Sequence, residues 1–347
     1  MIQNVTGCGP VQGPAIPVPF DNDTEDASQP ARRTRRMTPN VIPITPLYLR
    51  YRALRSADQA ERVRYARDVL ANPAWLAEEF VTTVLRFGEY DNADQHFYGK
   101  RDAHKFGRHL EATKDLVLRL DGQSSVTPVD ASDRQIGGTG HPDVIDVPAP
   151  DLAFEYVDRE LLLQRTESPA KWENGAANRG GIRPDILLAD LKTRTPIVAE
   201  LKLPGDMDPF FALVQALAGA AHLATSAQYE RMRNHLKRGK FPALSAPPRI
   251  DVFTLFVGRT EGSNQPDFLQ AAQTLPPQLL AHDGLATSIR RIAGISLALD
   301  PSDQITAEVL FAWERTDGHR QLNTSERELN RGAQRQRPVP YGVTSRP

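Results

Sequence analysis

Two short apolar segments, residues 183–190 and 196–203, carry acids where a buried strand normally has none. Asp185 lies in the first segment, and Glu200 and Lys202 lie in the second. A charge in such a segment costs on the order of several kcal/mol unless it is paired or bound to a ligand. The fold must therefore place these side chains beside partners or at a binding site.

The spacing of these charges predicts how the two segments pair. Side chains alternate between the faces of a strand, so Glu200 and Lys202 share a face. The polar residues between the segments favour a hairpin, and pairing Ala189 with Pro196 leaves a loop of four residues, a common hairpin length. In that register Asp185 lies directly opposite Glu200, with Cβ atoms about 4.5–5.5 Å apart.

A second acid–Leu–Lys triplet begins at Asp190 and imitates the one that begins at Glu200. It starts only five residues after Asp185, too few for a hairpin that brings both acids together. We therefore predict that Asp190 begins the turn, with Leu191–Arg194 as the loop.

The opposed carboxylates predict a metal site. Two ionised carboxylates repel each other unless a cation lies between them, and hard oxygen ligands suit Mg²⁺ or Mn²⁺. We expect Asp185 and Glu200 to bind such a cation, with the carbonyl of Leu201 as a further ligand. A metal held in this way binds phosphate oxygens and activates water. Lys202, one pleat along, is placed to orient that water or to stabilise charge at phosphorus.

The motif formed by these residues resembles a known family. A Pro-Asp pair ending at Asp185, a Glu-Leu-Lys triplet ending at Lys202 and a following helix that carries Gln215 are similar to the PD-(D/E)XK nuclease superfamily over about residues 155–260. The resemblance implies an α/β fold with a restriction-endonuclease-like α/β/α core, in which a helix precedes the core strands. It also implies metal binding by Asp185 and Glu200, and catalytic roles for both acids, Lys202 and Gln215.

The resemblance suggests further residues of the site. Some members carry a glutamate on the preceding helix, for which Glu160 is the nearest match as a metal ligand and Glu155 the alternative. Three basic residues near the acid pair are candidates for contacts with nucleic acid, namely Arg183, Lys192 and Arg194. We expect a Mg²⁺- or Mn²⁺-dependent endo- or exonuclease that hydrolyses phosphodiester bonds, with DNA as its partner.

Three other interpretations stay open. In the first interpretation, the chain keeps the nuclease fold without the reaction and binds nucleic acid or a protein. Alternatively, Asp185 or Glu200 forms an ordinary ion pair with Lys202 or Arg183 in an inert sheet, because motif matches carry false positives. In a third interpretation the N-terminal helical region is the functional part and the sheet is a scaffold.

Apolar patterns predict the other elements of a domain at residues 151–314. A helix rich in small residues should pack closely on the sheet. The expected elements, in chain order, are a helix near 151–166, the two strands above, helices near 208–224 and 226–238, a strand at 250–257, a helix near 276–292, and strands near 294–299 and 305–312.

The flanking regions differ in composition. We expect, in chain order, a disordered arm at 1–45, a helical region at 46–120 that serves as an accessory or substrate-recognition part, a linker and domain boundary at 121–150, and a flexible tail at 315–347. The spacings of His96, His104 and His109 do not suit a metal site, so we expect surface or packing roles for them.

Composition excludes several classes. The chain has 347 residues, 40% of them hydrophobic, so a sizeable core is expected. Its net charge of −1 neither predicts nor excludes a basic face. Cys8 is the single cysteine, which excludes a disulfide within the chain and suits a cytoplasmic protein. No apolar run reaches the roughly 18 residues that span a bilayer, so no membrane partner is expected.

Overall fold

The computed structural model describes the parts of the chain that form its helices and strands. These parts are residues 45–90, 98–99, 116, 118–123, 125–129, 141–159, 161–162, 184–203, 208–235, 241–243, 248–257, 266–299 and 305–316. All of them belong to one compact unit, Pro39–Pro347.

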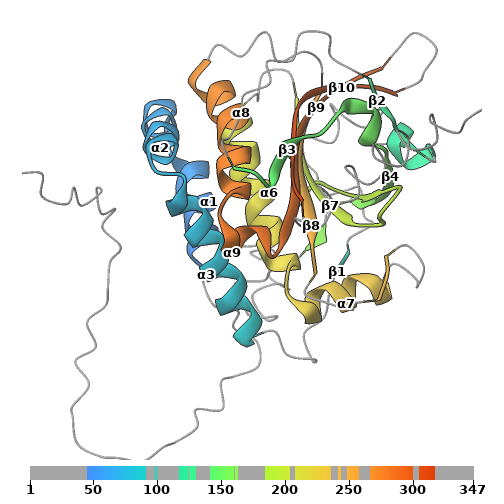
Figure 1. Ribbon diagram of the computed structural model, residues 1–347, viewed down its shortest axis with the longest axis horizontal. Helices are drawn as coiled ribbons and strands as arrows, with labels where there is room; N and C mark the ends of the chain where they lie inside the picture. Colours follow the sequence, from blue (N-terminus) through green and yellow to red (C-terminus); the bar gives the residue numbers. More distant parts are fainter. Residues whose placement is uncertain are drawn as a thin grey trace, which may run out of the picture. The chain divides into compact units, whose positions relative to one another are not determined.

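A mixed, curled sheet of eight strands is the centre of this unit (Figure 1). Seven strands follow one another in the order β2-β10-β9-β8-β7-β6-β4, and β3 pairs with the outer side of β10. Their bounds are β2 Pro128–Val129, β3 Val144–Asp146, β4 Phe154–Arg159, β6 Ile186–Asp190, β7 Pro196–Lys202, β8 Ile250–Val257, β9 Ile289–Leu299 and β10 Ile305–Arg315. A separate pair joins β1, Tyr98–Gly99, to β5, Leu161–Leu162.

Strand directions divide the sheet into two kinds of pairing. The β4–β6 and β6–β7 pairs are antiparallel, whereas β7, β8 and β9 run parallel to one another. The β9–β10 pair is again antiparallel. Parallel strands need a crossover connection, and α6 lies between β7 and β8 in the chain. The expected hairpin and the expected strand at 250–257 are therefore both present.

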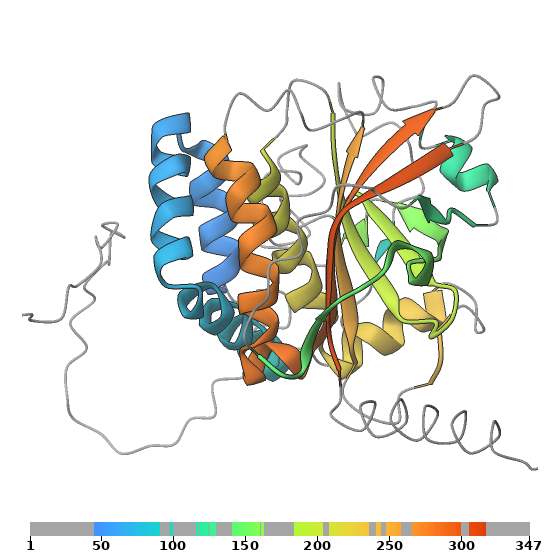
Figure 2. The same ribbon diagram turned by 45° about the horizontal axis from the view of Figure 1, so that its top comes forward.

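The long helices cover one face of the sheet (Figure 2). Helix α6 contacts β7 and β8 directly, and α1, α3 and α8 pack against α6. The helix bounds are α1 Pro46–Ser56, α2 Gln59–Ala71, α3 Ala74–Tyr90, α6 Pro209–Leu223, α7 Ser226–His235, α8 Pro266–Leu280 and α9 Asp283–Ala286. A short 3-10 helix, η2, spans Ala149–Asp151.

Small residues let α6 lie close to the sheet, as expected. A Cβ atom added at Gly219 would be 2.7 Å from Cγ of Pro184 and 3.2 Å from Val198. Both distances are shorter than ordinary contacts, so the glycine permits this approach. Pro209 occupies the first turn, and Asp208 caps the helix by accepting a hydrogen bond from the N–H of Phe211.

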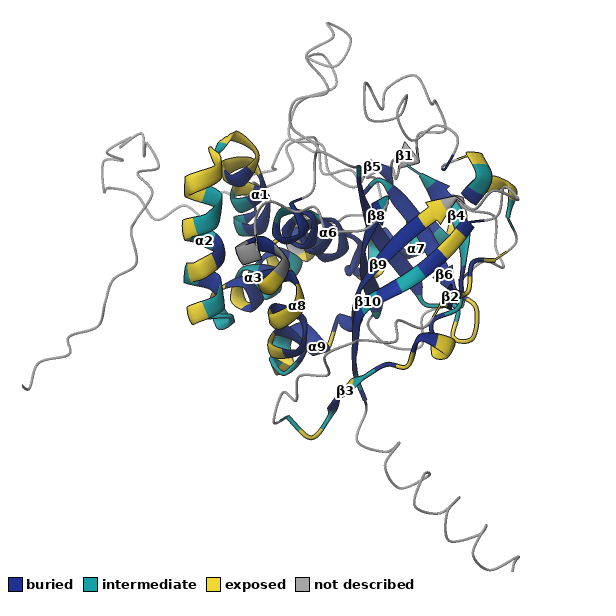
Figure 3. Cartoon of the chain, turned by 90° about the horizontal axis from the view of Figure 1, so that it is seen from above, coloured by how far each residue is buried: buried dark blue, intermediate teal, exposed yellow. Residues whose placement is uncertain are grey.

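Two apolar clusters fill the two faces of the sheet, whose strands are buried along most of their length (Figure 3). One cluster joins the helices to strand residues such as Leu187 and Val198. The other lies on the opposite face and includes Ile186 and Leu201. Strand neighbours therefore alternate between the clusters, as the pleat requires.

The expected helix near 151–166 is wrong, because Phe154–Arg159 forms strand β4. Apolar residues in this segment recur at spacings that imitate a helix, but β4 pairs with β6 over its whole length. A register shift between Tyr156 and Asp158 breaks the two-residue alternation that identifies a strand. Sheet pairing thus prevailed over the local pattern.

The elements near 276–299 also need correction. Helix α8 ends at Leu280, and Pro276 and Pro277 lie inside it rather than at the start of a new helix. Strand β9 begins at Ile289, well before the expected position near 294. Adjacent prolines are a typical signal of a helix start, which explains the misplacement.

The expected boundary at 121–150 is not present in the described residues. Strands β2 and β3 of this region pair with β10. Helices α1 and α3 share the apolar cluster that also contains α6 and strand residues. The helical region and the sheet therefore form one body. Residues 1–44, including Cys8, and His96, His104 and His109 lie outside the described part.

Candidate active site

The β6–β7 hairpin has the register expected from the sequence. Ala189 pairs with Pro196, and Ile186 pairs with Ala199. The N–H of Asp190 donates to the carbonyl of Thr195 at 2.9 Å and closes the loop. Continuing the register by one residue beyond Ile186 places the two acids, 185 and 200, opposite each other.

Asp190 is part of the turn, as predicted. Its Oδ1 accepts hydrogen bonds from the N–H of Lys192 at 3.0 Å and of Thr193 at 2.7 Å. Although burial alone raises the pKa of Asp190, the Thr193 N–H and the Arg290 guanidinium lower it below its usual value. The second acid–Leu–Lys triplet is thus a structural turn.

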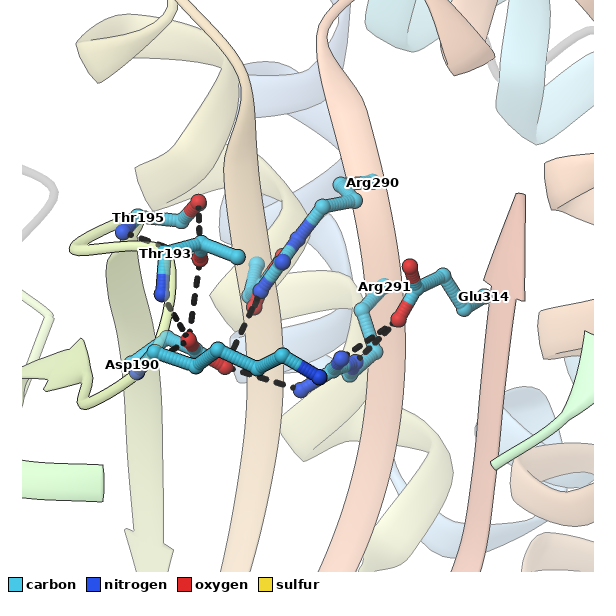
Figure 4. A network of polar contacts seen from close by, with 8 residues as sticks. Asp190, Thr193, Thr195, Arg290, Arg291 and Glu314 are labelled. Atoms are coloured by element: carbon cyan, nitrogen blue, oxygen red, sulfur yellow. Dashed lines mark hydrogen bonds and ion pairs between the residues drawn. The ribbon is translucent and has the colours of Figure 1, made fainter. Parts of the chain in front are cut away.

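A buried ionic network joins this turn to the middle of the sheet (Figure 4). Oδ2 of Asp190 accepts from Arg290 at 3.2 Å and from Arg291 at 3.1 Å. Arg290 also binds Asp251, and Arg291 binds Glu314. A bulge lies between Ile250 and Asp251 in the pairing of β8 with β9, which brings two consecutive arginines to one face.

The motif acids lie on the opposite face, beneath the helices. Val198 and Leu187 belong to the cluster on the helix side, so by alternation Glu200, Lys202 and Asp185 face that side as well. Their partners confirm this placement, since Lys202 reaches Gln215 of α6. The structure thus brings the four proposed catalytic residues to one face of the sheet.

Asp185 is half-buried and follows Pro184, which α6 contacts at Gly219. Its Oδ2 accepts a hydrogen bond from the N–H of Leu201 at 2.9 Å. The N–H and C=O of one strand residue point to the same neighbouring strand, so the carbonyl of Leu201 also points toward the Asp185 side. This is the direction that the expected role of the Leu201 carbonyl as a metal ligand requires.

Glu200 is fully buried. In the described part of the chain, neither Oε atom has a hydrogen-bond partner of normal geometry. Burial first, and then the charge of Asp185, raise the pKa of Glu200 well above its usual value, whereas Lys202 lowers it. The carboxyls of Glu200 and Asp185 are close enough to interact as hydrogen-bond partners. Two adjacent carboxyls without a cation disfavour double ionisation.

Lys202 is 5% exposed and lies between the sheet and α6. Its Nζ donates to Oε1 of Gln215 at 3.2 Å and lies 5.2 Å from the ring centre of Phe211. A buried ammonium held by an amide and an aromatic face is fixed in position, with donors left for a further acceptor.

Helix α1 adds residues that sequence reasoning missed. The ring of Tyr51 stacks on Phe211, with centroids 5.7 Å apart and planes 8° apart. Burial raises the pKa of Tyr51, Arg55 lowers it, and Glu200 and Asp185 raise it, so both carboxyls act on the Tyr51 hydroxyl. Tyr51 and Arg55 lie far upstream of the acid pair in the sequence, so no local pattern indicates this contact.

Asp208 and Arg62 extend the polar cluster. Nη1 of Arg62 lies 3.4 Å from Oδ2 of Asp208, and its guanidinium carbon is 4.9 Å from the ring centre of Phe211. Burial raises the pKa of Asp208, while Arg62 and Lys202 act in the opposite direction. Arg62 and Lys202 therefore both favour the charged form of Asp208, the residue that caps α6.

Other predicted site residues lie elsewhere. Glu155 is opposite Ala189, at the far end of β6 from Asp185, and its Oε1 binds Nη2 of Arg194 at 2.6 Å. Lys192 is exposed in the same distant turn. At about 3.3 Å per residue, this turn is roughly 17 Å from the acid pair. The structure does not bring these three residues to the site, and Glu160 and Arg183 lie outside the described part.

The donor set fits a divalent cation in part. Asp185, Glu200 and the carbonyl of Leu201 supply the hard oxygen ligands that Mg²⁺ or Mn²⁺ prefers. Glu200 in particular has two buried oxygens without normal hydrogen bonds. Among the residues that the structure describes, however, no group of three or more His, Cys, Asp or Glu side chains is placed to hold a metal.

No single described helix is long and apolar enough to cross a membrane. Helices α6 and α7 together have the length and apolar composition, but they are bent by 87° where they meet. Comparison with protein-family models, curated proteins and solved structures finds no match to this chain.

Proposed function

We propose that this protein is a metal-dependent nuclease that hydrolyses phosphodiester bonds in DNA, built on a restriction-endonuclease-like core. One observation carries the proposal: Glu200 is fully buried, lacks normal hydrogen-bond partners among the described residues, and lies beside Asp185. Burying such a carboxyl lowers the free energy of unfolding unless its oxygens bind a ligand. The nearby ammonium of Lys202 supplies the third group that the chemistry needs.

Each residue has a defined role in this proposal. Asp185, Glu200 and the Leu201 carbonyl would hold Mg²⁺ or Mn²⁺, which supplies an activated water and neutralises charge on the phosphate. Lys202 donates hydrogen bonds to the oxygen on which negative charge develops. Gln215 fixes Lys202 because its Oε1 accepts a hydrogen bond from Nζ of Lys202 at 3.2 Å. Asp185 is itself held by the N–H of Leu201.

Cleavage assays with purified protein test the proposal. With Mg²⁺ or Mn²⁺ the protein should cut at least one of circular, linear duplex or single-stranded DNA. Lys202→Ala and Asp185→Asn should each lower the rate by at least about a hundredfold, the loss expected for a group that stabilises the transition state. Asp185→Asn keeps an oxygen for the Leu201 N–H, so it should remain folded.

Lys192→Ala is the matched control, because Lys192 is an exposed lysine in the distant turn. It should retain full activity. Circular dichroism of each variant separates loss of chemistry from loss of fold. Cleavage that persists in both site variants contradicts the mechanism.

A second candidate function is a binding module that keeps the fold without the reaction. It is favoured by the ion pair of Glu155 with Arg194, which leaves two carboxylates at the site among the described residues. Titration with Mn²⁺ separates the two. The nuclease should bind Mn²⁺ with measurable heat that Asp185→Asn reduces, whereas DNA binding without Mn²⁺ binding or cleavage supports the module.

A further inference from the structure

Helix α1 packs on α6 and places Tyr51 near the site lysine. Tyr51 is 8% exposed, and its ring lies on Phe211, whose ring in turn lies near Nζ of Lys202. These aromatic contacts fix Tyr51 relative to the site lysine. The α1 helix therefore contributes directly to the surroundings of the acid pair.

Arg55 is the exposed cation of this arrangement. It lies one helical turn beyond Tyr51, and its Nη1 is 3.5 Å from the Tyr51 hydroxyl. The charges of Glu200 and Asp185 also raise the pKa of Tyr51. Tyr51 thus links the exposed guanidinium of Arg55 to the aromatic ring that lies against Lys202.

Two nearby arginines, Arg50 and Arg62, are paired with acids. Arg50 binds Glu79 at 2.6 Å, and Arg62 binds Asp208 at 3.4 Å. Within the described residues, no acidic side chain pairs with Arg55. Arg62 also donates to the carbonyls of Leu54, at 2.8 Å, and of Arg55, at 3.4 Å, and so braces the end of α1.

We propose that Arg55 binds a phosphate of the DNA substrate next to the scissile phosphate, which the cation site of Asp185 and Glu200 would bind, with Tyr51 fixing the Arg55 guanidinium. This inference rests on the proposed nuclease function. A guanidinium suits the task because its planar donors match phosphate oxygens, and an exposed cation near the site offsets the repulsion between its carboxylates and the DNA backbone. The helical region then forms part of the substrate site.

The test is steady-state cleavage of a short fluorescent DNA duplex, and of its single strand, by full-length protein with Mn²⁺. Arg55→Gln should raise KM about tenfold with little change in kcat, as expected for a contact made equally before and during the reaction. The salt dependence of kcat/KM should also become shallower by about one unit on a double-logarithmic plot. Arg55→Lys should restore the salt dependence.

Arg86→Gln is the matched control, since Arg86 is an exposed arginine on α3 near Gly88, which faces Thr225 beyond the far end of α6. It removes the same charge and should leave KM and the salt dependence unchanged. Tyr51→Phe keeps the ring on Phe211 and should raise KM in the same direction as Arg55→Gln.

The outcomes separate the two proposals. Wild-type cleavage with an Arg55→Gln variant of unchanged KM and salt dependence overturns the role of Arg55 and leaves the nuclease intact. Equal effects of Arg55→Gln and Arg86→Gln also overturn it, because they indicate a general charge effect. A wild-type protein that cuts neither DNA form overturns the nuclease function and this inference together.

Discussion

At the residue scale, Glu200 is the position where the proposed function and the stability of the fold conflict. A buried carboxyl beside a second carboxyl, with no hydrogen bond of normal geometry among the described residues, opposes folding whenever it is ionised. Under the proposed function, a bound divalent cation would offset this cost. The conflict gives a prediction that does not depend on observing cleavage.

Glu200→Gln should stabilise the apoprotein, and more so at higher pH. Because the folded-state pKa of Glu200 is raised, its contribution to stability is fully present below the unfolded value of about 4.3 and is lost as pH rises through the folded value. Glutamine does not titrate, so the variant should gain on the order of 1–3 kcal/mol between pH 5 and pH 8 relative to wild type. Urea unfolding in EDTA at both pH values measures this difference.

Glu78→Gln, at an exposed position of α3, is the control and should show no such change with pH. A Glu200→Gln difference that stays constant from pH 5 to pH 8 would mean that Glu200 is ionised normally. In that case the two carboxyls are not coupled as described.

Substitutions of Asp190 and Asp185 should have different effects, one on stability and the other on cleavage. Asp190→Asn removes a charge that two buried arginines bind, so it should lower the free energy of unfolding by about 3 kcal/mol. Asp185→Asn should change stability little and abolish cleavage. Parallel denaturation and cleavage assays check both, and an active-site role for Asp190 predicts full stability with lost activity instead.

The sequence was sufficient to predict the hairpin site but not its surroundings. Alternation and loop length determine the register, which is why Asp185 and Glu200 were paired correctly. Residues such as Tyr51 and Arg55 come from a distant helix, and their apolar pattern indicates only a buried face. Packing of α1 on α6 brings them to the site, and no local rule predicts that packing.

At the scale of elements, the approach of α6 to the sheet positions Asp185. Gly219 lies against Pro184, so a larger side chain must move the residue that precedes the site aspartate. Gly219→Ala should therefore cost about 1–3 kcal/mol from overpacking, against a helix-propensity gain of roughly 1 kcal/mol. Thermal unfolding should show net destabilisation, and cleavage should fall further than stability explains.

Gly88→Ala on α3 is the matched control. A Cβ atom there would meet only Cγ2 of Thr225 at 3.9 Å, an ordinary contact. This variant should gain about 0.5–1 kcal/mol, because alanine loses less backbone freedom than glycine in a helix. Stabilisation by both substitutions would show that α6 has room to move at Gly219.

Elements that depend on long-range pairing were the ones predicted poorly. The apolar residues of β4 recur at helical spacing, yet its partner β6 decides its conformation. Arg290 and Arg291 interrupt an apolar run at the start of β9, and only the acids of β8, β10 and the turn explain why they are buried there. By contrast, Ile250–Val257 is predominantly apolar despite Asp251 and Thr254, and its bounds match the prediction.

At the scale of the whole molecule, the N-terminal helices and the sheet share one apolar cluster. Leu76 and Phe80 of α3 lie in the same cluster as Leu213 of α6 and Trp313 of β10. Composition indicated a boundary at 121–150, because a polar, glycine-rich segment resembles a linker. The short strands in that segment are held by β10, which a sequence pattern of two or three residues does not reveal.

A single cooperative unfolding transition should follow from the shared cluster. In variants that keep only Trp75 or only Trp313, fluorescence should report the same urea midpoint, because α3 and β10 unfold together. Phe80→Ala should lower the free energy of unfolding by about 3–5 kcal/mol, since Phe80 is fully buried. Both urea midpoints should therefore fall by the same amount. Leu85→Ala on the same helix is the control, because Leu85 is 64% exposed. If Phe80→Ala shifts the Trp75 transition alone, the helices form a separate domain, and a direct contribution of α1 to the site becomes untenable.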